Sequence, residues 1–396
     1  MEKLNLSQSG LVTLRTLLGG ALLALGLALA LVAMGMFPGT STMAQSANGS
    51  IMKNGMRVIH SIHNDRSRPL RELAREWRPQ LEQEHEAAWN PHIANNHVDG
   101  IDPVVQRKMG VNKLGTHIPS PLMNFDGIPF PGVGCSCAPP DTNGEVGDTQ
   151  YVQIVNEGYQ VFDKANGNSL MGPTGISAIW SGFGGVCQSS GNGDPILLYD
   201  QLAHRWLVSQ FAGTSVPTDE CVAVSTTDDA TGSYNRYDFH LGTNFFDYPK
   251  IAVWPDAYYM AMNVFNSSGT ARLGAQAFAF DRNAMLAGNP ATIIATAQLS
   301  SSLPLMLPAD LDGSTLPPAG APNSFVFWPS NNTYRVYHFH VDFATPANAT
   351  FTSFAAPAAA SFTQLCPSTR ACVPELGVTS GNYVDGIGDR LMHRLA

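Results

Sequence analysis

The sequence predicts an all-β fold for most of its 396 residues, and three observations support this prediction. Hydrophobic residues make up 44% of the chain and charged residues only 13%, a balance typical of folded globular proteins. The 37 glycines and 27 prolines fall between short apolar runs, which indicates many turns. From Gly134 onward these runs form similar segments that lack the period of amphipathic helices.

Four of the similar segments share one plan, and they span residues 147–167, 193–213, 247–267 and 322–342. Each has a polar or proline-containing start, an apolar strand, a turn and a second strand rich in aromatic residues. A fifth start, GDRLMHRLA, closes the sequence. The acids that open these units are Asp148, Asp194, Asp247 and Asp389. Repeats of about 40–55 residues made of four short strands are typical of a β-propeller, whose blades stand around a channel.

We therefore predict a β-propeller of four-stranded blades over residues 131–396, with about five blades visible. The last blade would be incomplete, because the sequence ends within its first strand and an open edge exposes unpaired backbone. The sequence thus predicts a propeller truncated at its C-terminal end. A β-sandwich is the alternative, although it does not explain the similar opening of each unit.

Residues 1–44 have the features of a secretory signal peptide. Lys3 and Arg15 precede an apolar run over residues 17–37, and small or tolerated residues would suit cleavage after Ala44. The run is also long enough to span a bilayer, so an uncleaved membrane anchor is the alternative. Either way, the sequence predicts a protein outside the cytoplasm, whether secreted, periplasmic or at the cell surface.

Residues 45–130 are predicted to form a polar N-terminal extension with one short helix. Ser67 and Pro69 suit a helix cap and a first turn, and an apolar face follows them. That face comprises Leu70, Leu73, Ala74, Trp77 and Leu81. Pro79 should kink or end the helix. We expect the extension to pack against the main domain or to tether it.

The six cysteines are consistent with disulfides in an exported chain. The expected pairs are Cys366 with Cys372, which close a short loop, and Cys187 with Cys221. A bond between Cys135 and Cys137 across one residue would be strained, so these two either pair elsewhere or ligate a metal. No CxxC pair occurs, which gives a zinc site little support.

Charge is divided unevenly along the chain. Residues 1–130 hold 12 basic against 10 acidic side chains, whereas residues 131–396 hold 10 basic against 21 acidic, a formal charge of −11. Such an acidic body repels phosphate backbones, so we expect no nucleic acid as a partner.

Acids that open the strands of a propeller point toward one end of its channel, so Asp194, Asp247 and Asp389 are candidates for one shared site. Two carboxylates about 5–9 Å apart can carry out glycoside hydrolysis, one as the acid and the other as base or nucleophile. Asp194 and Asp247 are the candidate catalytic pair, and Asp389 is a candidate ligand-binding residue. The alternative, which the sequence favours, is that each acid caps its own strand or turn.

The stretch DTNGEVGD gathers oxygen ligands of the kind that calcium prefers, namely Asp141, Asn143, Glu145 and Asp148. It does not match the EF-hand loop, because the glycine follows Asn143 directly. Asp310 and Asp312 in ADLDG offer a similar pair. Calcium is thus a candidate cofactor, although Asx-turns explain the same residues without an ion.

The stretch YHFHVD places His338, His340 and Asp342 on one face of a strand. Alternate histidines can ligate a metal, but a polar face toward solvent or the channel is the favoured interpretation. His340 is kept as a candidate ligand-binding residue. Large aromatic residues are expected in the core between blades rather than as sugar platforms, and these are Trp180, Trp206, Trp254, Tyr258, Tyr259 and Trp328.

Five stretches give the chain a family resemblance: PLMNFDGIPFPGVGCSCAPPDTNGEVGDTQYVQIVN, GDPILLYDQLAHRWLVSQF, CVAVSTTDDATGSYNRYDF, DYPKIAVWPDAYYM and LPADLDG. In these the chain resembles bacterial exported proteins with sialidase-like propellers, over residues 121–395. The resemblance implies a fold rather than a reaction, because propellers host many functions. Sialidases carry repeated Asp-boxes and an arginine triad; the sequence has no Asp-box and no arginines that match the triad, so no catalytic residue is carried over.

We expect an exported β-propeller that acts as a binding or interaction module. Its partner would be a carbohydrate or a surface protein, held at the channel mouth or on loops between blades. The alternatives are a sialidase-like glycoside hydrolase and a scaffold domain of a longer surface protein. The enzyme interpretation predicts that at least one rim acid lies close to another and has a shifted pKa, whereas the binding interpretation predicts exposed aromatic residues without such a pair.

Overall fold

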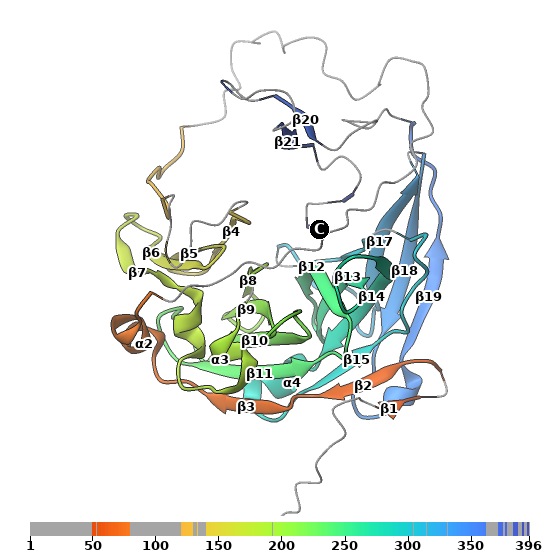
Figure 1. Ribbon diagram of the computed structural model, residues 1–396, viewed down its shortest axis with the longest axis horizontal. Coiled ribbons are helices and arrows are strands. Elements are labelled where there is room, and N and C mark those ends of the chain that lie inside the picture. The colour runs from red at the N-terminus through yellow and green to blue at the C-terminus, as the bar shows by residue number, and fades with distance from the viewer. Residues whose placement is uncertain are drawn as a thin grey trace, which may run out of the picture. The chain divides into compact units, whose positions relative to one another are not determined.

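The computed structural model describes most of the chain after residue 49 (Figure 1). The described residues are 50–52, 54–79, 120–129, 133, 140–191, 193–303, 305–313, 315–330, 332–361, 371–374, 377, 383–386, 390–391 and 394–395. The expected signal segment lies outside them, as do Cys135, Cys137, Cys366 and Asp389.

Four antiparallel sheets each contain four strands in chain order, and we call them blades 1 to 4. Blade 1 has β4 (Asn143–Val146), β5 (Gln150–Val155), β6 (Gly158–Asp163) and β7 (Ser169–Gly175). Blade 2 has β8 (Ile196–Asp200), β9 (Arg205–Ala212), β10 (Asp219–Ser225) and β11 (Tyr234–His240). Blade 3 has β12 (Phe245–Val253), β13 (Tyr258–Phe265), β14 (Arg272–Phe280) and β15 (Thr292–Ala295). Blade 4 has β16 (Leu307–Pro308), β17 (Asn323–Ser330), β18 (Thr333–His340) and β19 (Thr350–Ala355).

The first strands of successive blades lie next to one another. β4 contacts β8, β8 contacts β12, and β12 contacts β16 (Figure 1). Blades that meet at their first strands are the arrangement of a β-propeller, so the predicted fold class is confirmed. Beyond blade 4, β20 (Ala371–Val373) and β21 (Val384–Asp385) form a two-stranded sheet.

Packing on both faces explains why the middle strands are apolar throughout. Every residue of β13 is buried, because successive side chains point to opposite faces of the blade. Tyr258 and Met260 join the core between blades 2 and 3, whereas Tyr259 and Ala261 join the core between blades 3 and 4. Trp180 and Trp206 are likewise fully buried, between blades 1 and 2.

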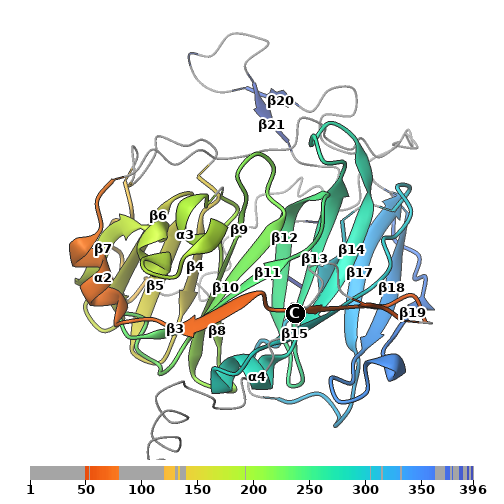
Figure 2. The same ribbon diagram turned by 60° about the horizontal axis from the view of Figure 1, so that its bottom comes forward.

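The N-terminal extension adds strands to the outer edges of two blades (Figure 2). β2 (Arg57–His60) pairs with β15 and carries β1 (Ser50–Ile51), while β3 (His63–Arg66) pairs with β11. Helix α2 (Leu70–Glu76) then packs against β7 and the 3-10 helix η1 (Ile176–Trp180). Because an unpaired edge strand invites aggregation, this strap also protects blades 2 and 3.

Helix α2 begins later than its expected cap. Pro69 is the N-cap residue and makes no side-chain cap hydrogen bond. The Ser67 hydroxyl instead donates to the Arg68 carbonyl and accepts from the Tyr234 N–H. Ser67 therefore joins the extension to blade 2 and does not cap the helix. Leu70 and Leu73 are buried as the apolar face predicted.

The remaining helices are short connections. They are α3 (Gly185–Ser189) before blade 2, α4 (Arg282–Ala287) between β14 and β15, and η2 (Pro346–Asn348) before β19. The Asp281 carboxylate caps α4 by accepting a hydrogen bond from the Ala284 N–H, 3.0 Å away. Within the described part of the chain, no helix combines the length and apolar character needed to cross a bilayer.

The expected repeats correspond to different strand pairs. Residues 193–213 and 247–267 contain the first two strands of a blade, whereas 147–167 and 322–342 contain the second and third. Asp148 consequently lies in the turn after β4 and does not open a blade. The error has a physical cause: a two-stranded hairpin with an apolar and an aromatic strand looks alike whichever two strands of a blade form it.

Candidate functional site

Three blades bend in the same way as the chain enters the first strand. Asp141, Asp194 and Tyr248 have φ angles of 42°, 46° and 56°, in a left-handed region that non-glycine residues seldom adopt. Asp141 and Asp194 lie two residues before β4 and β8 begin, whereas Tyr248 lies at a bulge within β12, two residues before its pairing resumes at Lys250. These bends occur at the same end of their blades, and they bring polar side chains from blades 1 to 3 to one end of the first strands.

Asp194 and Asp247 meet at one backbone group. The Tyr248 N–H donates to Asp194 Oδ2 at 3.2 Å and to Asp247 Oδ1 at 2.7 Å. Asp194 precedes blade 2 and Asp247 belongs to blade 3, so the shared donor places carboxylates of two blades side by side. The two acids that the sequence analysis paired are therefore neighbours.

Lys250 brings a positive charge to the same place. Its Nζ lies 3.5 Å from the centre of the Tyr248 ring and donates to the Pro249 carbonyl at 3.0 Å. Burial lowers the pKa of Lys250 to about 8, while the carboxylates of Asp141, Asp194 and Asp247 oppose that effect. We call these three acids and Lys250 the mouth cluster.

Asn156 and Arg390 lie next to the mouth cluster. Asp141 Oδ2 accepts a hydrogen bond of 2.7 Å from Asn156 Nδ2, which fixes its carboxylate on blade 1. The Arg390 guanidinium lies 5.4 Å from the centre of the Tyr248 ring and acts against the charge on Lys250. Arg390 directly follows Asp389, which lies outside the described residues. The cluster can thus offer carboxylate acceptors and cationic donors to one ligand.

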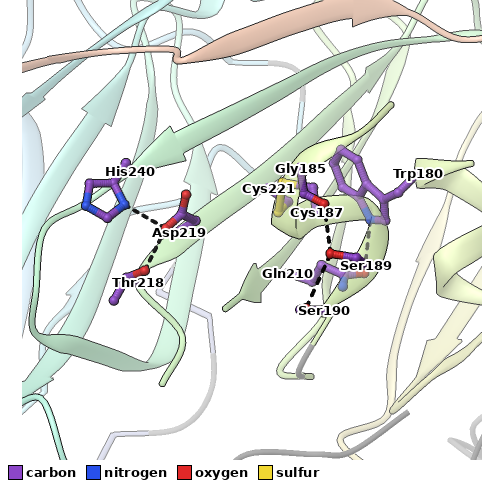
Figure 3. Close-up of a disulfide and its surroundings, with 10 residues drawn as sticks. All are labelled: Trp180, Gly185, Cys187, Ser189, Ser190, Gln210, Thr218, Asp219, Cys221 and His240. Atoms are coloured by element: carbon purple, nitrogen blue, oxygen red, sulfur yellow. Dashed lines mark hydrogen bonds and ion pairs between the residues drawn. A yellow bond between two sulfur atoms is a disulfide. The ribbon is translucent and has the colours of Figure 1, made fainter. Parts of the chain in front are cut away.

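The Cys187–Cys221 disulfide holds the segment that leads into Asp194 (Figure 3). Cys187 lies on α3 and Cys221 on β10, so the bond fastens the connection between blades 1 and 2 to the middle of blade 2. A hydrogen bond of 3.1 Å from Trp180 Nε1 to Gln210 Oε1 supports the same region. Cys372 is also disulfide-bonded.

An acid cluster lies beside that disulfide. His240 Nδ1 lies 2.7 Å from Asp219 Oδ1, which also accepts a hydrogen bond from the Thr218 hydroxyl (Figure 3). Burial, followed by the nearby Asp219, raises the pKa of Asp238 to about 7. The Asp219 hydrogen bond raises the pKa of His240. These residues join β10 to β11, and the sequence analysis did not single them out.

In the structure, the candidate calcium ligands bond to different partners. Asn143 Oδ1 accepts from the Leu197 N–H at 3.3 Å, and Glu145 pairs with Arg394. Asp148 Oδ2 lies 2.7 Å from His204 Nδ1, at the far end of β4 from Asp141. A calcium ion bound by all four residues would have to displace these partners, and the candidate ligands of ADLDG are likewise paired with Arg394.

His340 does not share a site with Asp194. It ends β18 and lies close enough to Asp256, in the β12–β13 turn, to act on the Asp256 carboxylate. That turn is at the opposite end of β12 from Asp247. His338 stacks on Phe354 with ring centres 3.9 Å apart, and Asp342 accepts hydrogen bonds from the Ala344 and Thr345 N–H groups as a turn residue.

Sequence reasoning missed Tyr248 and Lys250, and it considered Asp141 only as a calcium ligand. A signal for the bend is nevertheless present in the sequence, because Asp194 and Tyr248 both precede a proline. A residue before proline is restricted in its backbone conformation, so this shared dipeptide marks equivalent positions of two blades. It aligns Asp194 with Tyr248 rather than with Asp247.

Comparison with known proteins gives no family. No family model and no curated protein matches the chain. Solved structures of exo-beta-1,3-galactanase from Phanerochaete chrysosporium share 8–9% sequence identity, with TM-scores of 0.23–0.24. The matches cover 54–57% of this chain and 59–61% of the galactanase, so the chain spans less than two thirds of its length. One galactanase structure contains beta-1,3-galactotriose and another galactose.

Proposed function

We propose that this protein is an exported β-propeller that binds a carbohydrate through the mouth cluster. The observation that carries the proposal is the meeting of Asp194 and Asp247, from two blades, at the Tyr248 N–H, with the Lys250 amine on the ring of the same tyrosine. Carboxylates at fixed positions accept hydrogen bonds from adjacent hydroxyl groups, and an ammonium donates to ring or hydroxyl oxygens. A sugar offers both kinds of group in one small ligand.

Binding fits the charges better than catalysis does. An ammonium next to carboxylates favours their ionised forms, because opposite charges attract. Glycoside hydrolysis requires one of two carboxyl groups to hold a proton until it reaches the leaving group. Asp194 and Asp247 both act as hydrogen-bond acceptors toward the Tyr248 N–H, the same role that they would play toward a sugar hydroxyl.

Glycoside hydrolysis by Asp194 and Asp247 is the second candidate. It is favoured by the shared Tyr248 N–H, which holds the two carboxylates side by side. Closely spaced carboxyl groups are the arrangement of a nucleophile and an acid in retaining glycosidases. Sialidase-like ancestry remains a prediction of the sequence resemblance.

Export is proposed on separate grounds. Cys187 and Cys221 form a disulfide, and structural disulfides persist in oxidising compartments. The N-terminal signal features lead to the same proposal of a secreted or surface protein. Carbohydrate at a cell surface or in the surroundings would then be accessible to the mouth cluster.

A glycan array followed by calorimetric titration tests the proposal on the secreted full chain. We expect the Asp194→Asn, Asp247→Asn double variant to bind its glycan at least ten-fold more weakly, because two charged acceptors become neutral amides. The matched control is Asp148→Asn, which removes an exposed acid at the other end of β4 and should leave binding unchanged. Equal affinity of the double variant and the wild type would refute the proposal.

Chromogenic glycosides distinguish the two candidate functions. A binding module leaves every substrate intact while it still retains its glycan. Turnover by the wild type that disappears in the Asp194→Asn, Asp247→Asn variant would establish hydrolysis and replace the binding function.

A further inference from the structure

The sulfurs of Cys187 and Cys221 lie beside a buried carboxyl group. Cys221 on β10 and Asp238 on β11 are directly opposite each other in the strand register, so their side chains project from the same face of blade 2. Cys187 reaches that face from α3 (Figure 3). One ligand atom from each of the three residues, a sulfur or a carboxylate oxygen, lies within 4.8 Å of the other two. Three possible metal ligands thus converge at one place.

Asp238 has an acceptor that the rest of the fold does not use. Its Oδ1 is buried and accepts no hydrogen bond from any residue that the structure describes. Asp238 is 3% exposed, and Cys187 and Cys221 are 1% and 0% exposed. Helix α3 covers the carboxyl group, because a Cβ atom added to Gly185 would lie 3.5 Å from Asp238 Oδ2. Buried polar atoms normally have a partner, so this oxygen can accept one without losing another.

The disulfide keeps the two sulfurs from binding a metal, because the thiolate is the form of cysteine that acts as a ligand. A dithiol breaks the S–S bond: each sulfur takes up one electron and one proton, and the dithiol is oxidised to a disulfide. Two thiolates and a carboxylate are ligands that Zn²⁺ accepts, with water in the fourth tetrahedral position. Binding of the ion displaces the two thiol protons to solvent.

We infer that reduction of the Cys187–Cys221 disulfide opens a metal site, in which both thiolates and the Asp238 carboxylate bind a thiophilic divalent cation such as Zn²⁺. Asp219, the next acid on this face of β10, is already bonded to His240 and stays outside the ligand set. Oxidation of the thiolates by another disulfide, which takes up their two electrons, releases the ion. The inference goes beyond the proposed carbohydrate binding, because it uses no residue of the mouth cluster.

Titration with Co²⁺ tests the site, because thiolate ligands give this ion a charge-transfer absorption band. The full chain is reduced with dithiothreitol, separated from it without oxygen, and titrated. The reduced wild type should bind Co²⁺ at least ten-fold more tightly than the oxidised protein does. Asp238→Asn should weaken binding to the reduced protein at least ten-fold, since a charged ligand becomes a neutral amide. Asp228→Asn, an exposed acid between β10 and β11, is the matched control and should bind like the wild type.

The Cys187→Ser, Cys221→Ser variant measures the cobalt bound by the other four cysteines. Zinc should raise the unfolding temperature of the reduced wild type by more than that of this variant, because an ion that binds the folded state stabilises it. Circular dichroism shows whether the reduced chain is folded before and after zinc is added. Cobalt bands of the reduced wild type no stronger than those of the serine variant would overturn the inference, as would unchanged affinity of Asp238→Asn. A reduced chain that zinc neither stabilises nor refolds would also overturn it.

Discussion

Arg282 in α4 binds Asp200, at the end of β8, through hydrogen bonds of 2.7 and 3.0 Å. Asp200 is fully buried, and its Oδ2 also accepts from the Tyr258 hydroxyl at 2.8 Å. Asp200 Oδ1 also accepts hydrogen bonds from the Leu202 and Ala203 N–H groups. The pair thereby joins blade 2 to blade 3 with every charge compensated, at the opposite end of β8 from Asp194.

Replacing Arg282 by alanine should strongly destabilise the protein. The change leaves the Asp200 carboxylate buried without its counter-charge, and breaking a buried pair in this way typically costs about 3–5 kcal/mol. Urea unfolding followed by fluorescence measures the loss. The control is Arg68→Ala, which removes an exposed pair with Glu76 and should leave the unfolding midpoint unchanged. Similar midpoints for the two variants would show that the Asp200 pair does not join the blades.

Arg394 should contribute to stability as a link between blades 4 and 1. Its guanidinium pairs with Glu145 on β4 and lies 3.1 Å from Asp310, next to β16. Arg394→Ala leaves two partly buried acids facing each other, and we expect a loss of about 2 kcal/mol, less than for a fully buried pair. Arg205→Ala is the control, because among the described residues the Arg205 side chain bonds to the Ala203 and His204 carbonyls of its own turn and to no acid. A loss no greater than that of the control would contradict the link.

The Cys187–Cys221 disulfide should stabilise the connection into Asp194. The bond closes a loop of 34 residues, and the lost entropy of the unfolded chain corresponds to about 3–4 kcal/mol. Replacing both cysteines by alanine should lower the free energy of unfolding by that order. It should also speed hydrogen exchange in α3, which the bond fastens to β10. A variant with wild-type stability and wild-type exchange in α3 would show that packing alone holds this segment.

The sequence predicts the architecture well because every blade of a propeller is built from strands of the same kind. Short apolar strands separated by turns, with both faces of the middle strands buried, are visible in the composition of β9 and β13 alone. The edge strands added by residues 57–66 were not predicted, since their apolar run is only two residues long at Val58 and Ile59 and their partners lie far along the chain. Backbone pairing across such a distance leaves no periodic trace in the sequence.

The sequence predicted only part of the candidate site. Asp194 and Asp247, which the sequence analysis paired, lie next to each other at the Tyr248 N–H, whereas their role as catalytic or binding residues stays a prediction. The group that joins the two acids is the Tyr248 N–H, and a backbone donor of this kind has no signature in the sequence.

Glu220 should make the protein less stable as the pH rises. Burial on β10, where its neighbours in register are Phe211 and Phe239, raises the pKa of Glu220 to about 8, and the nearby Ser209 hydroxyl offsets only part of this effect. Between the ordinary glutamate pKa of 4.5 and that value, the folded protein keeps a proton that the unfolded chain has released. The free energy of unfolding therefore falls with rising pH, by up to about 1.4 kcal/mol per unit.

Glu220→Gln should remove that part of the pH dependence, because an amide neither gains nor loses a proton. Asp238 and His240, whose pKa values are also raised, contribute a fall of the same sign, but they remain in both proteins and cancel in the difference. Urea unfolding at a series of pH values should give two curves that coincide near pH 5 and separate toward pH 8, with the variant the more stable. Glu72→Gln, at an exposed position on α2, is the control and should follow the wild type. Parallel curves for Glu220→Gln and the wild type would mean that the Glu220 carboxyl is ionised in the folded protein, which would require a cationic partner or water beside it between blades 2 and 3.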